Sequence, residues 1–398
     1  MPVPGTHNGT IDTIGTAEFS LRYGVERYDF VWSPSAPATH YELWEDPDGP
    51  GPLPEAQAGA ALTGTRHTFE IKQLHQRVNA TYRLRECTGT SCTFRATTLT
   101  PDVLRAHFLF DRQGSSVLAP FNPTAGTPVL VSADLKTLVI GAPDPVSTTT
   151  LPRPAPAVDD SAVHVFVRSA VGEAWQPQAQ LQASNRRAPA CNNVAQDYCH
   201  SSSFGAQLAL SADGNTLAVS ATGETSNARG VNGDQANTDS LAAGAVYIFT
   251  RTGGKWSQQA YVKASNTPAR NNTWCNLSYW ATLPCDGQNF GASLALSADG
   301  NLLAVGATGD DSKSTGVNGD ANDTSAAFAG AVHTYVRTGS TWAPQAYLKA
   351  SNTDAGDGFG TSVSLSADGS TLAVGAIFER SSATGVGGNQ SDLSLIHI

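Results

Sequence analysis

The sequence lacks the features that mark membrane proteins and nucleic-acid-binding proteins. It contains no run of 18 or more apolar residues, which is the length that a membrane-spanning helix needs. Only 15% of its 398 residues are charged, and the formal net charge is -10, so there is no basic surface to neutralise a phosphate backbone. We therefore expect neither a nucleic-acid partner nor a membrane segment in this chain.

Known catalytic motifs are also missing. The chain has no GxSxG elbow, no HExxH pair and no Walker loop, and its nine histidines are scattered. A site assembled in three dimensions would escape this search, but the positions that recur along the chain hold apolar and turn residues rather than unique polar ones. We expect no catalytic residues and no enzymatic activity in this chain.

Helical periodicity is absent as well. No stretch sustains an apolar period of 3.6 residues, whereas 38 glycines and 22 prolines separate short apolar runs. This pattern predicts an all-β fold, and the length of 398 residues predicts two domains. The start, MPVPGTHNGT, has neither the basic nor the apolar region of a secretion signal, so export has to be inferred from other features.

Cysteine is scarce but paired. The six cysteines form three close pairs: Cys87 with Cys92, Cys191 with Cys199, and Cys275 with Cys285. Local disulfides are the simplest explanation, and they imply an oxidising, extracellular or cell-surface location. Zinc is the alternative, but no pair has CxxC spacing, and the nearby histidine, His200, serves one pair alone.

One segment is written four times along the chain. The copies read AGTPVLVSADLKTLVIGAP, FGAQLALSADGNTLAVSAT, FGASLALSADGNLLAVGAT and FGTSVSLSADGSTLAVGAI, and they start at residues 125, 204, 290 and 359. Their shared aspartates are Asp134, Asp213, Asp299 and Asp368, which lie 79, 86 and 69 residues apart. A repeat of this size with variable loops predicts a repeat architecture.

Each repeat predicts four antiparallel strands. In the third copy, FGASLALS and LLAVGA flank Asp299-Gly300, a dipeptide that favours the positive φ values of a tight hairpin. A polar loop follows, and then GAVHTYVRT and TWAPQAYLKAS supply two more strands around a Gly-Ser turn. Four antiparallel strands in one repeat predict a β-propeller blade.

The Phe-Gly openings and the Gly141-Ala142-Pro143 closing of the first copy resemble FG-GAP repeats of the integrin α type. The resemblance covers roughly residue 117 to the end. The first copy departs from it, with Ala125 in place of Phe and Leu135 in place of the turn Gly. The resemblance implies an extracellular β-propeller, usually of seven blades, that binds proteins or glycans on one face and often holds calcium in its blade loops.

These patterns set the expected domain layout. Residues 1–100 form a β-sandwich, residues 101–116 a linker or first propeller strand, and residues 117–398 the repeats. At the observed period only about four blades fit, so we expect an incomplete propeller. The fourth copy stops inside its long loop, and LSLIHI does not continue the pattern, which predicts a truncated chain with a non-native tail. A smaller or open repeat array is the alternative.

The first hundred residues carry short alternating runs such as YDFVWSP, THYELWEDP and NATYRLREC, which predict a small β-sandwich. Trp32, Tyr41, and Leu74 eight residues before Tyr82 resemble the core markers of a fibronectin type III domain. Because they lie among alternating apolar residues, Trp32 and Tyr82 are expected to pack in the core rather than to contact a ligand.

The loop between the second and third strands is the candidate metal site. Copies two and three both contain Gly-Val-Asn-Gly-Asp, and calcium takes six to eight oxygen ligands. The candidate ligands are Asp310, Asp311, Asn318, Asp320, Asn322 and Asp323 in copy three and Asn232, Asp234, Asn237 and Asp239 in copy two. The spacing differs from DxDxDG calcium loops, and solvated Asx turns are the alternative.

Two groups of aromatic residues receive different interpretations. Trp175, Trp256 and Trp342 recur with the blade, so we expect them to pack between neighbouring blades. Trp274, Tyr279 and Trp280 belong to an inserted loop found in one copy only, and they are candidate ligand-binding residues.

The expected function is an extracellular or cell-surface adhesion or ligand-recognition module whose propeller loops bind a protein or a glycan without catalysis. One alternative is a substrate-binding accessory propeller of a secreted enzyme whose catalytic domain lies outside this chain. Another is a structural repeat protein without a specific ligand.

Overall fold

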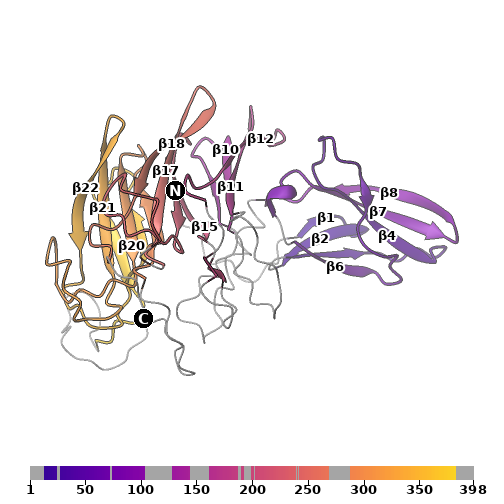
Figure 1. Ribbon diagram of the computed structural model, residues 1–398. Helices are drawn as coiled ribbons and strands as arrows, with labels where there is room; N and C mark the ends of the chain where they lie inside the picture. The colour runs from indigo at the N-terminus through magenta and orange to yellow at the C-terminus, as the bar shows by residue number, and fades with distance from the viewer. Residues whose placement is uncertain are drawn as a thin grey trace. The chain divides into compact units, whose positions relative to one another are not determined.

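The computed structural model describes residues 13–24, 27–71, 74–103, 128–143, 161–186, 190–191, 199–200, 202–238, 240, 242–268 and 287–381 (Figure 1). As predicted, these residues are nearly all β-strand, turn and loop. The chain divides into two compact units, residues 1–129 with 172–176, and residues 130–171 with 177–398. Each unit is described by itself.

The first unit contains two four-stranded sheets, ordered β1-β2-β3-β6 and β5-β4-β7-β8. The strands are β1 (Thr13–Gly15), β2 (Phe19–Gly24), β3 (Arg27–Trp32), β4 (His40–Asp46), β5 (Ala56–Gln57), β6 (Arg66–Glu70), β7 (Thr81–Thr88) and β8 (Ser91–Leu99). A 3-10 helix, η1 (Leu74–Gln76), precedes β7.

Aromatic side chains from both sheets of the first unit meet in its core. The ring of Tyr82 lies 5.0 Å from that of Phe30 and 5.8 Å from that of Tyr28, and all three side chains are buried. Trp32 is 2% exposed and packs on Tyr41. Trp32 and Tyr82 are therefore core residues, as the alternating pattern predicts, and the two sheets form a sandwich.

The described part of the second unit contains three four-stranded antiparallel sheets and two two-stranded sheets; the four-stranded sheets and the two-stranded sheet β23-β24 follow the four sequence copies. The first sheet joins β9 (Val129–Val131), β10 (Thr137–Ala142), β11 (Ala162–Val167) and β12 (Gln176–Leu181), and the second joins β15 (Phe204–Leu210), β16 (Thr216–Ala221), β17 (Ala245–Thr252) and β18 (Lys255–Val262). The third joins β19 (Phe290–Leu296), β20 (Leu302–Ala307), β21 (Ala331–Thr338) and β22 (Thr341–Leu348), and copy four supplies β23 (Phe359–Leu365) and β24 (Leu372–Ala376). The three four-stranded sheets have the strand number and order of propeller blades.

The shared Ser-Ala-Asp segment forms the turn between the first two strands of each blade. In copy three, the Ser297 hydroxyl donates to Oδ1 of Asp299 at 2.6 Å, and the same oxygen accepts from the Asn301 amide at 3.0 Å. Gly300 follows with φ +69°, so the predicted Asp-Gly hairpin is confirmed. In copy one, Leu135 occupies the equivalent position at φ +59°, a region that costs energy for a residue with a side chain.

The Phe-Gly openings of copies three and four are held against the preceding blade. The Phe290 amide donates to the Ala243 carbonyl at 3.1 Å, and the Phe359 amide donates to the Ala329 carbonyl at 3.0 Å. A Cβ on Gly244 would lie 2.2 Å from the Phe290 carbonyl oxygen, which is closer than any real contact. Glycine is needed there because two backbones meet.

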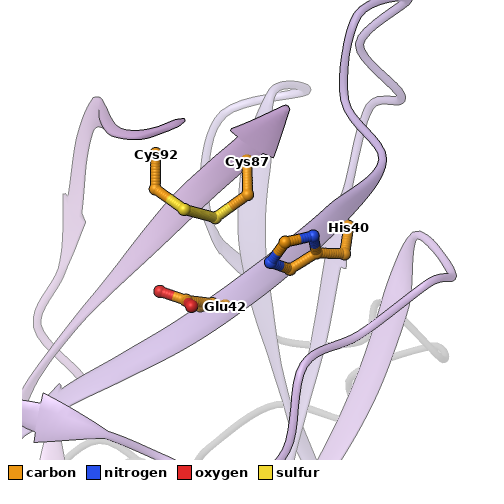
Figure 2. A group of neighbouring side chains, drawn as sticks. All are labelled: His40, Glu42, Cys87 and Cys92. Atoms are coloured by element: carbon orange, nitrogen blue, oxygen red, sulfur yellow. A yellow bond between two sulfur atoms is a disulfide. The ribbon is translucent and has the colours of Figure 1, made fainter. Parts of the chain in front are cut away.

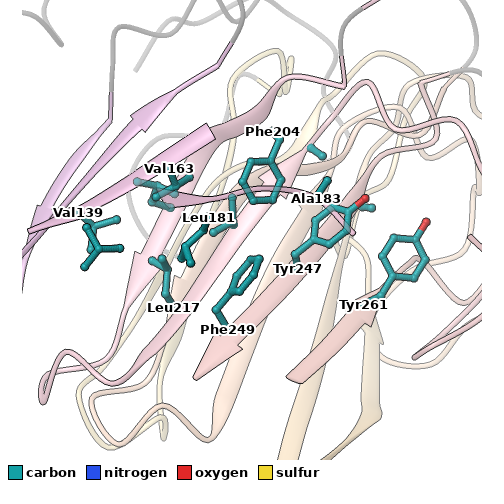
Figure 3. Close-up of a cluster of buried hydrophobic side chains, with 14 of the residues drawn as sticks. Val139, Val163, Leu181, Ala183, Phe204, Leu217, Tyr247, Phe249 and Tyr261 are labelled. Atoms are coloured by element: carbon teal, nitrogen blue, oxygen red, sulfur yellow. The ribbon is translucent and has the colours of Figure 1, made fainter. Parts of the chain in front are cut away.

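Successive blades bury their facing surfaces in shared clusters. Val139, Val163 and Leu181 of the first sheet pack with Phe204 and Tyr247 of the second (Figure 3). A second cluster joins the second and third sheets through residues such as Ile248, Val305 and Tyr335. Because the second sheet contributes buried residues to both clusters, it is apolar on both faces and has to be stacked between neighbours, as the blades of a repeat protein are.

Candidate functional site

The two ends of the blades differ in what they display. The antiparallel order places the short turns, between first and second strands and between third and fourth strands, at one end. It places the long connections, such as residues 222–244 and 308–330, at the other end (Figure 1). The end with the long connections is the candidate binding surface, and we call it the loop end.

The Gly-Val-Asn-Gly-Asp segment covers the outer strand of its own blade. The Asn318 amide donates to the Tyr347 carbonyl at 2.7 Å, and Asn318 Oδ1 accepts from the Tyr347 amide at 2.9 Å. Asn232 makes the same two bonds with Tyr261. Both asparagines adopt φ of +55°, which their short polar side chains tolerate. The motif therefore protects an edge strand.

A buried ion pair anchors the loop of copy three. The ammonium of Lys349 lies 3.0 Å from Oδ1 of Asp310, and both side chains are buried. The Tyr347 hydroxyl donates to the same oxygen at 2.8 Å, and Asn266 Nδ2 of the preceding blade donates to Oδ2 at 2.8 Å. Burial lowers the pKa of Lys349, and the attraction of Asp310 opposes this shift.

Copy two repeats this arrangement with a glutamate. Lys263 lies 2.7 Å from Oε2 of Glu224, and Asn185 of the preceding blade donates to Oε1 at 3.0 Å. Burial likewise lowers the pKa of Lys263. In copy four, Asn352 donates to Oε1 of Glu379 at 2.8 Å. The asparagine of each Ala-Ser-Asn segment thus ties one blade to the loop base of the next.

Most of the predicted calcium ligands have hydrogen bonds within the loop. Asp311 Oδ1 accepts from the Phe328 amide, and Asp323 accepts from the Lys313 and Ser325 amides. Asx turns are formed by Asp320 with the Asn322 amide and by Asp234 with the Ala236 amide, and Asn237 Oδ1 accepts from Asn227. Asp239 lies outside the described residues. Calcium binding stays a prediction, and Asp310, Asn318 and Asn232 have other roles.

The predicted ligand-binding aromatics Trp274, Tyr279 and Trp280 also lie outside the described residues. Two of the three repeated tryptophans, Trp256 and Trp342, behave as expected for packing between blades. Trp256 Nε1 donates to Gln178 Oε1 of the preceding blade at 2.9 Å, and Trp342 Nε1 donates to Gln259 Oε1 at 2.9 Å.

The cysteine predictions have different outcomes. Cys87 and Cys92 form a disulfide between β7 and β8, as predicted. Cys191 and Cys199 are register partners in the two-stranded sheet of β13 (Ala190–Cys191) and β14 (Cys199–His200), and their disulfide stays a prediction. Cys275 and Cys285 lie outside the described residues.

Sequence reasoning missed two residues beside the disulfide. His40 of β4 is the register partner of Cys87, and Glu42 lies two residues further along the same strand. One ligand atom from each of His40, Glu42, Cys87 and Cys92 lies within 4.8 Å of the others (Figure 2). In the described parts of the chain this is the one group of at least three His, Cys, Asp or Glu residues with such spacing. The pairing of β4 with β7 brings it together, which the linear spacing does not reveal.

Comparisons with known proteins support the repeat family in part. A family model of the FG-GAP repeat matches residues 342–390, from β22 through β24. Together with the four-stranded antiparallel sheets, this match fits a β-propeller. No curated protein matches the sequence.

Among solved structures, the crystal structure of Hsv2 from Kluyvelomyces marxianus aligns with 91% of this chain and 87% of that chain, at 8% identity. Its TM-score of 0.21 carries no argument about fold or function. The described residues contain no helix with the length and apolar character needed to cross a membrane.

Proposed function

We propose that this chain is an extracellular or cell-surface recognition module that binds a protein or glycan at the loop end of its propeller blades, without catalysis. The observation that supports this proposal is a contrast within the blades. The contacts that hold the blades and loop bases together repeat from one blade to the next, whereas the loop sequences differ. The same Asn-carboxylate-lysine anchors and Trp-Gln contacts recur in the second and third blades. The exposed positions of the loops differ, since Arg229 and Ala236 of copy two correspond to Thr315 and Asn322 of copy three.

A frame that is fixed by buried contacts can carry loops of varied sequence with little loss of stability, which suits a binding surface. Val317 contributes to this surface, because its side chain is 66% exposed at the loop end. The neighbouring exposed residues Lys313, Asp320 and Asn322 offer charge and hydrogen-bonding groups. Mixed apolar and polar exposure of this kind is typical of interfaces with proteins and sugars.

The resemblance to fibronectin type III domains belongs to the same proposal. It is supported by the sheet order β5-β4-β7-β8 opposite β1-β2-β3-β6 and by the burial of Trp32 and Tyr82. The integrin α-type relationship of the repeats is supported by the Phe-Gly positions. We propose that the first unit acts as a spacer that carries the blades.

The proposal is tested by probing arrays of glycans and of extracellular-matrix proteins with the labelled full chain. A variant with Val317→Ser, Asp320→Ser and Asn322→Ser alters the loop end and leaves the buried anchors intact. The control, Lys255→Ser with Thr341→Ser, alters the opposite end of the second and third blades. Saturable binding that the loop variant loses and the control keeps supports the proposal. Equal binding by both variants contradicts it.

An accessory propeller of a secreted enzyme is the second candidate, because it needs the same loop surface. It predicts that the bound array members are all polymers of one substrate class.

Calcium is tested by calorimetric titration of Ca²⁺ into the wild type and into Asp320→Asn with Asp323→Asn. Binding that the double variant loses supports a loop calcium site, and absence of binding to the wild type leaves the Asx-turn explanation.

A further inference from the structure

We propose that reduction of the Cys87–Cys92 disulfide converts its surroundings into a binding site for a zinc-like divalent cation, with His40 and Glu42 as the other two ligands. This site lies in the first unit and goes beyond the recognition function proposed for the loop end.

The four side chains occupy neighbouring positions on one face of a sheet. His40 pairs with Cys87, and Cys87 pairs with Cys92, so the three side chains form a row across β4, β7 and β8. Glu42 lies two residues from His40 and therefore on the same face. Figure 2 shows the imidazole and the carboxylate on the side of the sheet that carries the sulfur atoms. A mutual distance within 4.8 Å is close to what a tetrahedral zinc site requires.

Hydrogen bonds around the cluster prepare His40 to bind a metal. The Thr39 hydroxyl donates to the Cys87 carbonyl at 3.1 Å and lies 3.2 Å from Nδ1 of His40. With its proton directed to the carbonyl, this hydroxyl accepts a hydrogen bond from the Nδ1–H group, which leaves the lone pair on Nε2 for a cation. Metal-binding histidines usually have such an outer hydrogen bond on the second nitrogen.

The charges of the cluster also fit a zinc ion. Two thiolates and one carboxylate around a divalent cation leave one net negative charge. Arg85 lies 3.2 Å from Oε2 of Glu42 and offsets that charge. Because Arg85 and the Trp44 indole both donate to Oε2, the carboxylate is fixed in place, and Oε1 is available as the ligand atom.

The hairpin has contacts that keep its register after the disulfide opens. The pair closes a loop with a sequence separation of only 5, so it restricts the unfolded chain less than a longer loop would. The Cys87 carbonyl is held by the Thr39 amide at 2.8 Å, and β4, β7 and β8 stay joined by their ladders. The two thiols would therefore remain adjacent.

The chemistry balances in two steps. A dithiol reductant supplies two electrons and two protons, so the S–S bond breaks, each sulfur becomes a thiol, and the reductant becomes a disulfide. The divalent cation then binds both sulfur atoms, and the two thiol protons leave to solvent. No further redox change is needed, and reoxidation of the thiols would expel the cation.

The experiment titrates Co²⁺ as a zinc probe into the full chain, oxidised or reduced with a phosphine, and follows thiolate-to-cobalt charge-transfer absorption. Far-UV circular dichroism checks that the reduced chain keeps its strands. Cys87→Ser with Cys92→Ser shows the contribution of the remaining cysteines, and His67→Ala is the matched control for His40→Ala. We expect one additional Co²⁺ in the reduced wild type, displaced by Zn²⁺, and an affinity weakened by at least about tenfold in His40→Ala and Glu42→Ala.

Several results would overturn the proposal. One is that the reduced wild type and the Cys87→Ser, Cys92→Ser variant bind the same amount of Co²⁺ with the same spectrum. Another is that the oxidised chain binds as tightly as the reduced chain, since the thiolates would then not be ligands. An unchanged affinity in His40→Ala, or loss of the strands on reduction, would equally exclude the four-ligand site.

Discussion

The ammonium of Lys349 donates to Oδ1 of Asp310 across 3.0 Å, and neither side chain is exposed to solvent. The pair lies where the outer strand of the third blade meets the base of its long loop. Removing one partner leaves a buried charge uncompensated, which costs far more than the loss of a surface ion pair. We therefore expect this pair to stabilise the position of the loop base against the outer strand of the blade.

We expect Lys349→Met to lower the free energy of unfolding by about 3–5 kcal/mol, because the carboxylate of Asp310 would stay buried without its cation. Denaturant unfolding measures the change. Arg27→Met is the control, since Arg27 pairs with Asp29 but its side chain is 52% exposed, and a change of about 1 kcal/mol or less is expected there. Equal effects in the two variants would show that the Lys349 pair is solvated in solution.

His333 differs from the residue at the equivalent position of copy two, and this difference leaves two buried polar atoms without hydrogen-bond partners among the described residues. In copy two, Tyr247 occupies the corresponding position, and its hydroxyl donates to Asn185 Oδ1. In copy three, the shorter side chain of His333 does not reach Asn266, the residue that corresponds to Asn185. Among the described residues, neither His333 Nε2 nor Asn266 Oδ1 has a hydrogen-bond partner. Both atoms are buried, and His333 lines a small cavity of about 140 Å³.

We expect His333→Tyr to raise the free energy of unfolding by about 1–2 kcal/mol, because the new hydroxyl can bond Asn266 as Tyr247 bonds Asn185. The reverse change in copy two, Tyr247→His, should lower it by about 1–3 kcal/mol. Thermal and denaturant unfolding measure both. Destabilisation by His333→Tyr would mean that the third blade has no room for the longer ring.

The same residue predicts a dependence of stability on pH. Burial lowers the pKa of His333 to about 4, from an ordinary value of 6.5. Between these values the unfolded chain binds a proton that the native chain refuses, so stability falls as the pH drops from 6.5 towards 4. We expect the melting temperature of His333→Tyr to fall less than that of the wild type as the pH drops from 6.5 towards 4. An identical pH profile would show that His333 is accessible to solvent.

The sequence predicted the blades well because their strands depend on local patterns. Alternating apolar residues around Asp299-Gly300 determine a hairpin, and Phe-Gly openings such as Phe290-Gly291 mark the start of the second, third and fourth copies. The burial of Trp32 and Tyr82 also followed from alternation alone. These features need no knowledge of distant partners.

The candidate sites were harder to predict because their partners are distant in sequence. Asp310 and Asn318 look like calcium ligands in the linear order, but one pairs with Lys349 and the other caps the backbone of Tyr347. His40 joins Cys87 through strand pairing across 47 residues of chain. The alternating sequence predicts which face a side chain occupies, but not which strand lies beside it.

The Ser-Ala-Asp-Gly turns predict a second effect of pH. Hydrogen bonds from Ser297 and Asn301 lower the pKa of Asp299, and equivalent donors lower that of Asp368 to about 2. These carboxylates contribute stability above their unfolded pKa near 4 that is lost as the pH falls towards 2. We expect Asp299→Asn to lower the melting temperature at pH 7 and to have little effect near pH 2.

Glu173→Gln is the control for that experiment, because it removes the same charge from an exposed position between β11 and β12. A similar loss in both variants at neutral pH would mean that net charge, rather than the turn, explains the result. A loss in Asp299→Asn that persists unchanged near pH 2 would show that the ionised carboxylate is not what stabilises the turn.

Arg337 joins two blades, and its geometry predicts that lysine cannot replace it. Its guanidinium donates to Asn301 at 2.9 Å within its own blade and to Thr216 of the preceding blade at 3.2 Å, and it lies over the ring of Trp342. A lysine ammonium lacks the planar fork that makes these contacts together. We expect Arg337→Lys to lower the free energy of unfolding by about 1–3 kcal/mol and to broaden the transition, since coupling between neighbours makes repeat arrays unfold together. Lys255→Ala, in an exposed turn, should change neither the midpoint nor the slope of denaturant unfolding, and an unaltered transition in Arg337→Lys would show that the apolar clusters alone couple the blades.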